Sequence, residues 1–227
     1  MTTHNPDTNA LRRLVFGRAT CRAYLPEQVP EDVIRNVVDV ARGTASWCNT
    51  QPWHLIITSG ENTDKFRNAL MEQVREHPEL DSDFPFPADY RGVYLDRRRE
   101  SGFQLYEALG IGRGDRARRE SQSFENFRLF GAPHVAIVTV PEELGTYGAV
   151  DAGGFISAFL LSAEAHGVAT TPQAALAMQS RFIRNYFGIP EGRKMVCGIS
   201  FGYADKAHPV NGYRTRRANM DDILHLI

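Results

Sequence analysis

The chain has 227 residues, 42% of them hydrophobic, and a formal net charge of -1 at pH 7. This length and apolar content are enough to bury a full core, and they predict a single domain over residues 1–227. A charge so close to neutral provides no general attraction for nucleic acid or for an anionic membrane, so we expect neither as a partner.

The polar and reactive residues point to a reducing compartment, and we expect the cytoplasm. Cys21, Cys48 and Cys197 are odd in number and widely spaced, which argues against a disulfide framework and against a Cys-x-x-Cys pair. The histidines show no paired spacing, so we expect no metal site. The first eight residues are polar and lack an apolar stretch, so we expect no secretory signal.

Helical periodicity and short apolar runs alternate along the chain. Pro30, Glu31 and Asp32 mark the start of one helix, because proline and acidic residues favour a first turn. The pattern predicts helices over 9–16, 30–43, 61–77 and 180–187, and strands over 53–59, 134–140 and 195–203. The segment after residue 204 is expected to be loop with a short apolar end over 223–227.

Residues 78–130 look like an insertion, because prolines interrupt the periodicity before them and two further helices follow. These helices are predicted over 97–109 and 115–129, joined by a glycine-rich turn at 110–114. That turn is not a dinucleotide fingerprint, since it follows a helix rather than a strand.

A helix over 149–166 is apolar on nearly every side, and we expect it to be buried all round. Its small residues would let another helix approach closely. Packing against its own copy in a dimer and burial in a monomer core both satisfy this pattern. The apolar run over 153–163 lies between Asp151 and Glu164 and is much shorter than the roughly 20 residues that span a bilayer.

Three distant stretches carry the chemistry: RATCR at 18–22, NTQPW at 49–53 and RTRR at 214–217. Guanidinium groups suit the bidentate clamping of a phosphomonoester. A fixed cation also favours the reduced isoalloxazine ring, whose N1/O2 edge is anionic. A carboxamide donates and accepts at once, as the pyrimidine edge of that ring requires. Together these stretches predict one flavin mononucleotide (FMN) site.

Four segments in this order resemble the FMN-dependent nitroreductase family, in particular the branch that reduces nitrobenzoates and dinitroanilines. They are RATCRAY at 18–24, NTQPWH at 49–54, GVATTPQAAL at 167–176 and the segment 198–222. The resemblance runs from about Leu11 to Asp222. It implies an α+β nitroreductase-like fold with a central, mostly antiparallel sheet flanked by helices, in an intertwined homodimer. The insertion at about 78–130 would then be a helical lid.

The resemblance also implies a role for each site residue. Arg18 and Thr20 would contact the phosphate or ribityl chain, Arg22 would lie by the N1/O2 edge, and Asn49 would read the pyrimidine edge. The full predicted cofactor-binding set is Arg18, Ala19, Thr20, Arg22, Asn49, Gln51, Pro172, Gln173, Ala174, Ala175, Arg214 and Arg217. Within it, Pro172 to Ala175 would present main-chain groups to N5 and O4, and Arg214 and Arg217 would complete the phosphate clamp.

The predicted substrate pocket is aromatic and contains Trp47, Tyr106, Phe124 and Phe127. Trp47 stands where the family commonly has a small residue, so its indole either points away from the flavin or forms a wall of the pocket. The other rings have core packing as the plain alternative, because aromatic residues at helical spacing are usually packed.

The implied activity is an oxidoreductase that takes electrons from NADH or NADPH and passes them through FMN to an electron-poor aromatic in ping-pong fashion. No residue is predicted to be catalytic, because the cofactor performs the transfer. Other reactions on the same fold, such as quinone or enone reduction, reductive dehalogenation and flavin breakdown, stay open, as does a non-catalytic flavin-binding protein. The stretch 198–202 matches a G-x-S-x-G nucleophile elbow, but too little chain follows it to supply an acid and a histidine.

Overall fold

The computed structural model describes residues 5–227. Residues 1–4, the first half of the polar N-terminal stretch, lie outside the described residues. Its centre is a four-stranded sheet with the order β1-β2-β4-β3, and every neighbouring pair is antiparallel. The strands are β1 (His54–Thr58), β2 (His134–Pro141), β3 (Ala169–Gln173) and β4 (Arg193–Gly202). The predicted α+β fold with an antiparallel sheet is confirmed.

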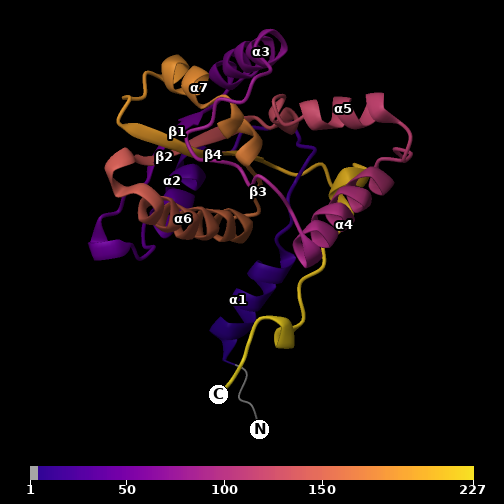
Figure 1. The fold of residues 1–227 in the computed structure, drawn as a ribbon. Coiled ribbons are helices and arrows are strands. Elements are labelled where there is room, and N and C mark those ends of the chain that lie inside the picture. Colours follow the sequence, from indigo (N-terminus) through magenta and orange to yellow (C-terminus); the bar gives the residue numbers. More distant parts are fainter. Residues whose placement is uncertain (1–4) are drawn as a thin grey trace.

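Helices cover both faces of this sheet (Figure 1). α2 (Glu31–Ala41) and α6 (Gly145–Ala165) lie on one face, and α3 (Glu61–Glu76) and α7 (Ser180–Phe187) lie on the other. The central strand β2 alternates between two cores: Ala136 and Val138 belong to the cluster under α2 and α6, whereas Val135 and Ile137 belong to the cluster under α3 and α7. Period-two alternation on a sheet buried on both sides therefore produces two apolar layers.

Most predicted elements are confirmed, with shifts at their ends. The first helix, α1 (Pro6–Gly17), begins earlier than predicted because Asn5 caps it: its Oδ1 accepts the Asp7 N–H at 2.9 Å, and a proline occupies the first turn. Strand β3 was not predicted. Thr170, Thr171 and Gln173 are buried polar residues, so the strand lacks the apolar alternation that would have indicated it.

The insertion contains the two predicted helices, α4 (Gly92–Ala108) and α5 (Arg116–Phe124), which stand beside the sheet (Figure 1). Neither helix has a buried residue. α5 ends before the predicted residue 129, because the chain turns into the core there: Leu129 and Phe130 are buried and both have positive φ, 58° and 52°.

Within the single chain, the long apolar helix α6 is buried on one side only, so the monomer-core alternative is wrong and packing against a second copy is left as the way to bury it all round. Phe155 and Phe159 of α6 are buried against the sheet, but Tyr147 and Val150 are 60% and 61% exposed on the other side. Gly153, Gly154 and Ser157 share this exposure. Among residues 5–227, the segment Glu142–Ala165 is long and apolar enough to span a membrane by length and composition. A core helix passes the same test, and α6 packs on α2 and the sheet.

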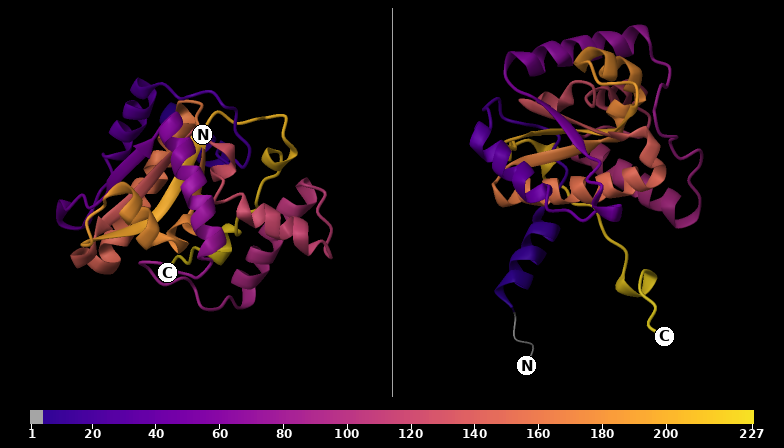
Figure 2. Two further views of the ribbon diagram at one scale, coloured as in Figure 1. Left: turned by 90° about the horizontal axis from the view of Figure 1, so that it is seen from above. Right: turned by 90° about the vertical axis from the view of Figure 1, so that its left-hand side faces the viewer.

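Two segments project from the body of the molecule (Figure 2). One is α1, and the other is the C-terminal segment, which runs away from the sheet beyond Gly212. Both expose large apolar side chains to solvent: Leu11, Phe16, Met220, Ile223, Leu224, Leu226 and Ile227. A chain that leaves such side chains uncovered has more apolar surface than its own core can bury.

Candidate functional site

The segment that carries Arg18 and Arg22 is fixed along the free edge of β3. Thr20 forms a parallel bridge with Thr170, and the Cys21 N–H donates to the Thr170 carbonyl at 3.0 Å. The Thr171 hydroxyl in turn donates to the Cys21 carbonyl. This short backbone pairing extends the sheet by a few residues and holds the segment with one arginine on each side of Thr20.

Six of the predicted cofactor residues line one cavity of about 560 Å³. They come from both ends of the chain: Arg18, Ala19, Thr20, Arg22, Arg214 and Arg217. The remaining walls come from α1 (Val15, Phe16), from Ser101 of α4 and from the C-terminal segment. Four guanidinium-bearing residues from distant segments therefore share one hollow, which we call the arginine cavity.

The charge in the arginine cavity is not balanced. Arg18 is half-buried, and burial lowers its pKa; the nearby Arg217 lowers it further, against an opposing effect of Glu164. Within residues 5–227, Arg18 Nη1 is buried and has no hydrogen-bond partner. A buried guanidinium N–H without an acceptor is costly, and an anionic oxygen would satisfy it. The donor set fits a phosphomonoester.

Arg22 is held more firmly than Arg18. Its backbone N–H donates to Asn211 Oδ1 at 2.8 Å, and its Nη1 donates to the Tyr213 hydroxyl at 2.7 Å. The guanidinium carbon lies 6.0 Å from the ring centres of both Phe130 and Tyr213. Asn211 and Tyr213 lie in the C-terminal segment that carried the resemblance, but neither was among the predicted site residues.

The turn after β3 follows the part of the strand that contacts this segment. Thr20 pairs with Thr170, and the Thr171 hydroxyl donates to the Cys21 carbonyl, just before Pro172 and Gln173 end the strand. Ala174 and Ala175 follow in the short turn η4 (Ala174–Met178). The Gln173 side chain is buried and makes hydrogen bonds inside the protein, so only its main chain is free to face a ligand.

The predicted residues Asn49 and Gln51 lie on a separate loop that contains the turn η1 (Trp47–Asn49). Its backbone is unusual, since Cys48, Asn49 and Gln51 all have positive φ, at 48°, 57° and 46°. Such conformations in residues other than glycine cost free energy and persist where surrounding contacts enforce them. Here the Gln51 N–H donates to Ser46 Oγ at 2.9 Å, and Gln51 Nε2 donates to Asn49 Oδ1 at 3.2 Å.

The structure does not bring this loop to the arginine cavity of the same chain. Asp151, near the start of α6, accepts the Trp47 N–H at 3.1 Å, whereas Glu164, near the end of α6, faces Arg18. Glu164 is thirteen positions after Asp151 on the helix, which corresponds to about 20 Å at 1.5 Å per residue. Within one chain, the predicted flavin site is therefore in two parts.

The four predicted pocket aromatics are also dispersed. Trp47 is 61% exposed and lies against Tyr147 on α6, with ring centres 4.9 Å apart. Tyr106 is covered by Arg119 within the insertion, and Phe124 lies beneath Arg75, 5.8 Å from the ring of Phe127. Phe127 packs against the apolar cluster under α3 and α7, which is the plain alternative for that residue.

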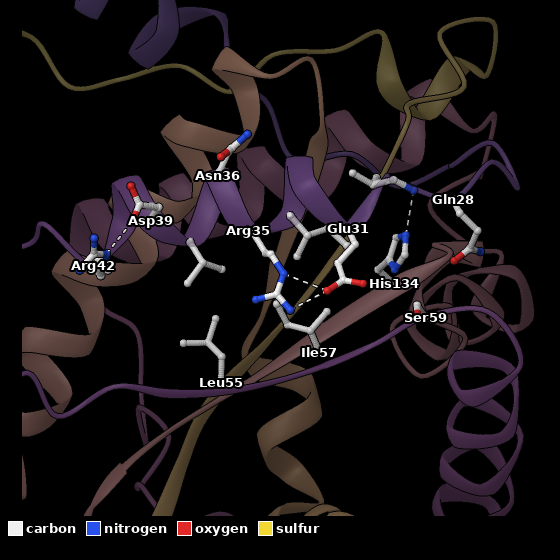
Figure 3. Close-up of a pocket in the computed structure, with 13 residues that line it drawn as sticks. Gln28, Glu31, Arg35, Asn36, Asp39, Arg42, Leu55, Ile57, Ser59 and His134 are labelled. Carbon is white, nitrogen blue, oxygen red and sulfur yellow. Dashed lines mark hydrogen bonds and ion pairs between the residues drawn. The ribbon is translucent and has the colours of Figure 1, made fainter.

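Two other features of the surface and the sequence do not belong to this site. Ser200 of the elbow-like stretch lies inside β4, is fully buried and donates to Gln173 Oε1, so a serine nucleophile is excluded there. A larger hollow, of about 980 Å³, lies between α2 and the edge strand β1 (Figure 3). It contains none of the predicted site residues. Residues 5–227 hold no group of three metal-ligating side chains.

Comparison with known proteins agrees with this geometry. The model of the Nitroreductase family matches residues 15–203. Nitroreductase NfnB of Mycolicibacterium smegmatis is 38% identical over 94% of this chain and 91% of that protein. A 4-nitrobenzoate reductase of Nocardioides sp. is 34% identical over 95% of this chain and 89% of that protein. The crystal structure of the FMN-dependent nitroreductase NfnB from Mycobacterium smegmatis in complex with NADPH is 37% identical, with a TM-score of 0.92 over 96% of this chain and 98% of that one. The chain belongs to the nitroreductase family.

Proposed function

We propose that this protein is an FMN-dependent NAD(P)H oxidoreductase that reduces nitroaromatic or related electron-poor aromatic compounds. The observation that carries the proposal is the arginine cavity, in which Arg18 Nη1 is buried and finds no hydrogen-bond partner among residues 5–227. The relatives named as nitrobenzoate reductase and as FMN-dependent nitroreductase support the substrate class and the cofactor.

The chain's own residues would bind the two ends of FMN differently. Arg18, Arg214 and Arg217 would clamp the phosphate, and Thr20 would donate from its hydroxyl. Arg22, held by Tyr213, would place a fixed positive charge beside the N1/O2 edge of the ring. The backbone from Pro172 to Ala175 would offer main-chain groups to N5 and O4, since it directly follows Thr170 and Thr171, which contact Thr20 and Cys21.

Bound FMN supplies hydride transfer from NAD(P)H to the aromatic acceptor. The protein needs no acid or base for that step, so its task is to orient one flat molecule at a time and to exclude water. The insertion at 78–130 would do this as a lid. Tyr106, Phe124 and Phe127 would contribute aromatic surface from the lid, and Trp47 would contribute it from the loop on α6.

The two-part site also supports a homodimer. A two-fold axis perpendicular to α6 would pack the exposed faces around Gly153, Gly154 and Ser157 of two copies together and make the two helices antiparallel. The start of one helix, which holds the Asn49 loop through Asp151, would then lie beside the end of the other, which faces Arg18. Asn49 and Gln51 of one copy would complete the arginine cavity of its partner.

The projecting C-terminal segment supports the same assembly. β1 is an edge strand, and its outer side borders the hollow whose apolar floor includes Ile34, Leu55 and Ile57 (Figure 3). An open edge next to an apolar groove is a template for an added strand. The exposed end of this chain, Ile223 to Ile227, is apolar like the groove. In the proposed dimer, this segment of one copy lies in the groove of the other.

We place the protein in the cytoplasm, with no membrane and no nucleic acid as partners. The near-neutral charge and the three unpaired cysteines support this location. Fractionation of cells that express the full chain tests it: the protein is expected in the soluble cytosolic fraction, and recovery with membranes would contradict the proposal.

Spectroscopy of the purified protein tests the activity. A flavin protein absorbs at about 450 nm; that band should disappear when NADPH or NADH is added without oxygen and return when 4-nitrobenzoate follows. Arg18→Met should be purified with little flavin. The matched control is Arg216→Met, because Arg216 is in the same segment as Arg217 but points to Glu100 at 3.4 Å and lies outside the cavity. A protein that neither carries nor binds FMN would refute the proposal.

Mixing two defective variants tests the shared site. Arg18→Met and Asn49→Ala should each bind FMN poorly as homodimers. If each site uses Arg18 of one copy and Asn49 of the other, subunit exchange creates heterodimers with one intact site and restores flavin binding to part of the population. If both residues act within one chain, every site in the mixture remains defective and binding does not recover.

A further inference from the structure

Two buried glutamines bracket the turn η4, which contains Ala174 and Ala175. Gln173 precedes the turn and Gln179 follows it, and they are only 2% and 4% exposed. Neither side chain makes a hydrogen bond within η4. Each amide instead reaches one end of the insertion at 78–130, and the two glutamines reach opposite ends.

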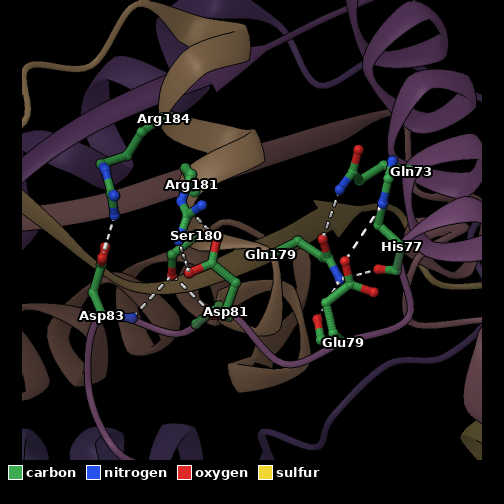
Figure 4. Close-up of polar contacts among 10 residues, drawn as sticks. Gln73, His77, Glu79, Asp81, Asp83, Gln179, Ser180, Arg181 and Arg184 are labelled. Carbon is green, nitrogen blue, oxygen red and sulfur yellow. Dashed lines mark hydrogen bonds and ion pairs between the residues drawn. The ribbon is translucent and has the colours of Figure 1, made fainter.

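Gln179 binds the start of the insertion. Its Nε2 donates to the His77 carbonyl at 3.0 Å and to the Glu79 carbonyl at 3.3 Å, while its Oε1 accepts from Gln73 Nε2 at 3.2 Å (Figure 4). Both N–H groups and the carbonyl of the amide are therefore occupied. A buried amide that is satisfied in this way fixes the backbone that it contacts.

The backbone next to Gln179 strengthens this attachment. The Asp81 N–H donates to the Met178 carbonyl at 2.9 Å, and the Ser180 N–H donates to the Asp81 carbonyl at 2.9 Å. Asp83 then pairs with Arg184 and accepts the Met195 N–H at 2.7 Å (Figure 4). The first residues of the insertion are thus bonded to η4, α7 and β4.

Gln173 binds the end of the insertion. Its Nε2 donates to the Asn126 carbonyl at 2.8 Å, and its Oε1 accepts from the Ser200 hydroxyl. Asn126 lies between Phe124 and Phe127, two of the aromatic residues assigned to the substrate pocket. The position of these rings relative to η4 therefore depends on the hydrogen bond from the Gln173 side chain to Asn126.

We infer that Gln173 and Gln179 are positioning residues that fix the insertion over η4 and thereby set the selectivity among aromatic substrates. This inference rests on the proposed function, since it takes η4 as the turn beside the flavin and the insertion as the lid. Neither glutamine side chain reaches the arginine cavity, whose walls are formed by other residues. The pair should therefore act on substrate choice, and Gln179, which is outside the predicted cofactor-binding set, should do so while flavin binding stays intact.

The test compares Gln173→Met and Gln179→Met with two matched controls in the full-length, flavin-loaded protein. Ser200→Ala removes the partner of Gln173 Oε1 but leaves the bond to Asn126. Gln73→Met removes the partner of Gln179 Oε1 but leaves the bonds to His77 and Glu79. Each control therefore removes the hydrogen bond to the carbonyl oxygen of one glutamine amide and keeps the hydrogen bonds from its NH2 group to the insertion.

The readout is the ratio of kcat/KM for 4-nitrobenzoate to that for nitrobenzene, which does not depend on the active fraction. Both methionine variants should raise the KM for 4-nitrobenzoate about tenfold and change the ratio at least about threefold. In Gln179→Met, the FMN Kd should also stay within about twofold of wild type. Both controls should keep the wild-type ratio. An unchanged ratio in the methionine variants, or an equal change in the controls, would overturn the inference.

Hydrogen exchange separates a failure of this inference from a failure of the proposed function. Backbone amides at 78–84 should exchange faster in Gln179→Met than in Gln73→Met, and amides at 126–130 should exchange faster in Gln173→Met than in Ser200→Ala. Unchanged exchange at both ends would overturn the attachment itself. A wild-type protein that reduces neither compound would refute the proposed function, whereas the exchange measurement would still decide the attachment.

Discussion

Arg18 and Arg217, almost 200 residues apart in sequence, lie close enough for the charge of Arg217 to lower the pKa of Arg18. Both line the arginine cavity, and Arg18 Nη1 has no partner within residues 5–227. Placing like charges together costs stability in the absence of a ligand, so the pair is best explained as a preformed site for an anion. This relationship leads to the first prediction.

Arg217→Gln should not destabilise the flavin-free protein, and it should raise its stability by up to about 0.5 kcal/mol, because it relieves repulsion at a partly solvated site. The same change should reduce the increase in Tm that FMN produces. Thermal melts with and without FMN measure both effects. Arg216→Gln, which removes the pair with Glu100, is the control and should leave the effect of FMN unchanged. A large loss of stability in flavin-free Arg217→Gln would contradict the account.

His134 predicts a pH dependence of folding. Its Nε2 accepts the Val29 N–H at 2.9 Å, so Nδ1 carries the proton and donates to the Thr58 carbonyl at 3.0 Å. Burial lowers the pKa of His134, with a smaller opposing effect of Thr58. The unfolded chain therefore takes up a proton at a higher pH than the folded one does. Stability should be fully present above about pH 6.5 and fall as the pH decreases below that value.

Urea unfolding between pH 7.5 and 5.5 measures this dependence. His134→Gln should be less stable than wild type at pH 7.5, but its stability should change less across that range. His77→Gln, which replaces an exposed histidine in the same way, is the matched control. An equal slope in wild type and His134→Gln would show that His134 does not carry the effect.

Gly153→Leu should separate folding of the chain from assembly. A side chain at Gly153 meets nothing within 4 Å in the single chain, so the fold itself has room for it. In the proposed dimer, the same position lies where two copies of α6 cross, and a leucine there would force the helices apart. Light scattering should find monomers, and flavin binding should be lost with the dimer. A fully dimeric Gly153→Leu protein would place the interface elsewhere.

Deleting residues 223–227 should weaken the dimer without unfolding the chain. The removed end is exposed in the single chain, so its own core loses nothing. If it adds to the edge strand β1 of the partner, sedimentation should report a dimer Kd raised at least about a hundredfold, as expected for the loss of several buried apolar side chains. A dimer Kd equal to that of wild type would leave the groove beside β1 without its proposed occupant.

The fold was largely predictable because most elements repeat apolar residues with the period of a helix or strand. β3 was the exception: its buried threonines and glutamine are satisfied by hydrogen bonds rather than by apolar packing, as in the pair of Thr171 with Tyr24 at 2.7 Å. A pattern based on hydrophobicity cannot detect such a strand. The face of α6 around Tyr147 and Val150 is the opposite case, since it is apolar although residues 5–227 leave it exposed.

The site was only partly predictable. Residue chemistry was enough to select Arg18, Arg22 and Arg217, but not to show that the Asn49 loop and Arg18 lie near two acids of α6, Asp151 and Glu164, that are about 20 Å apart along the helix. That separation depends on which ends of one helix the two segments contact. The sequence feature that could have indicated this separation is the pair of acids that flank the apolar run, Asp151 and Glu164. Each of them faces one part of the divided site.

The central claim is that Arg18 and Arg217 recognise the phosphate of FMN. The most direct measurement is the Kd of the protein for FMN and for riboflavin, which lacks the phosphate, in wild type and in the double variant Arg18→Met, Arg217→Met. Wild type should bind FMN at least about a hundredfold more tightly, and the double variant should lose that preference while keeping its affinity for riboflavin. Equal affinities in wild type, or an unchanged preference in the double variant, would contradict the account.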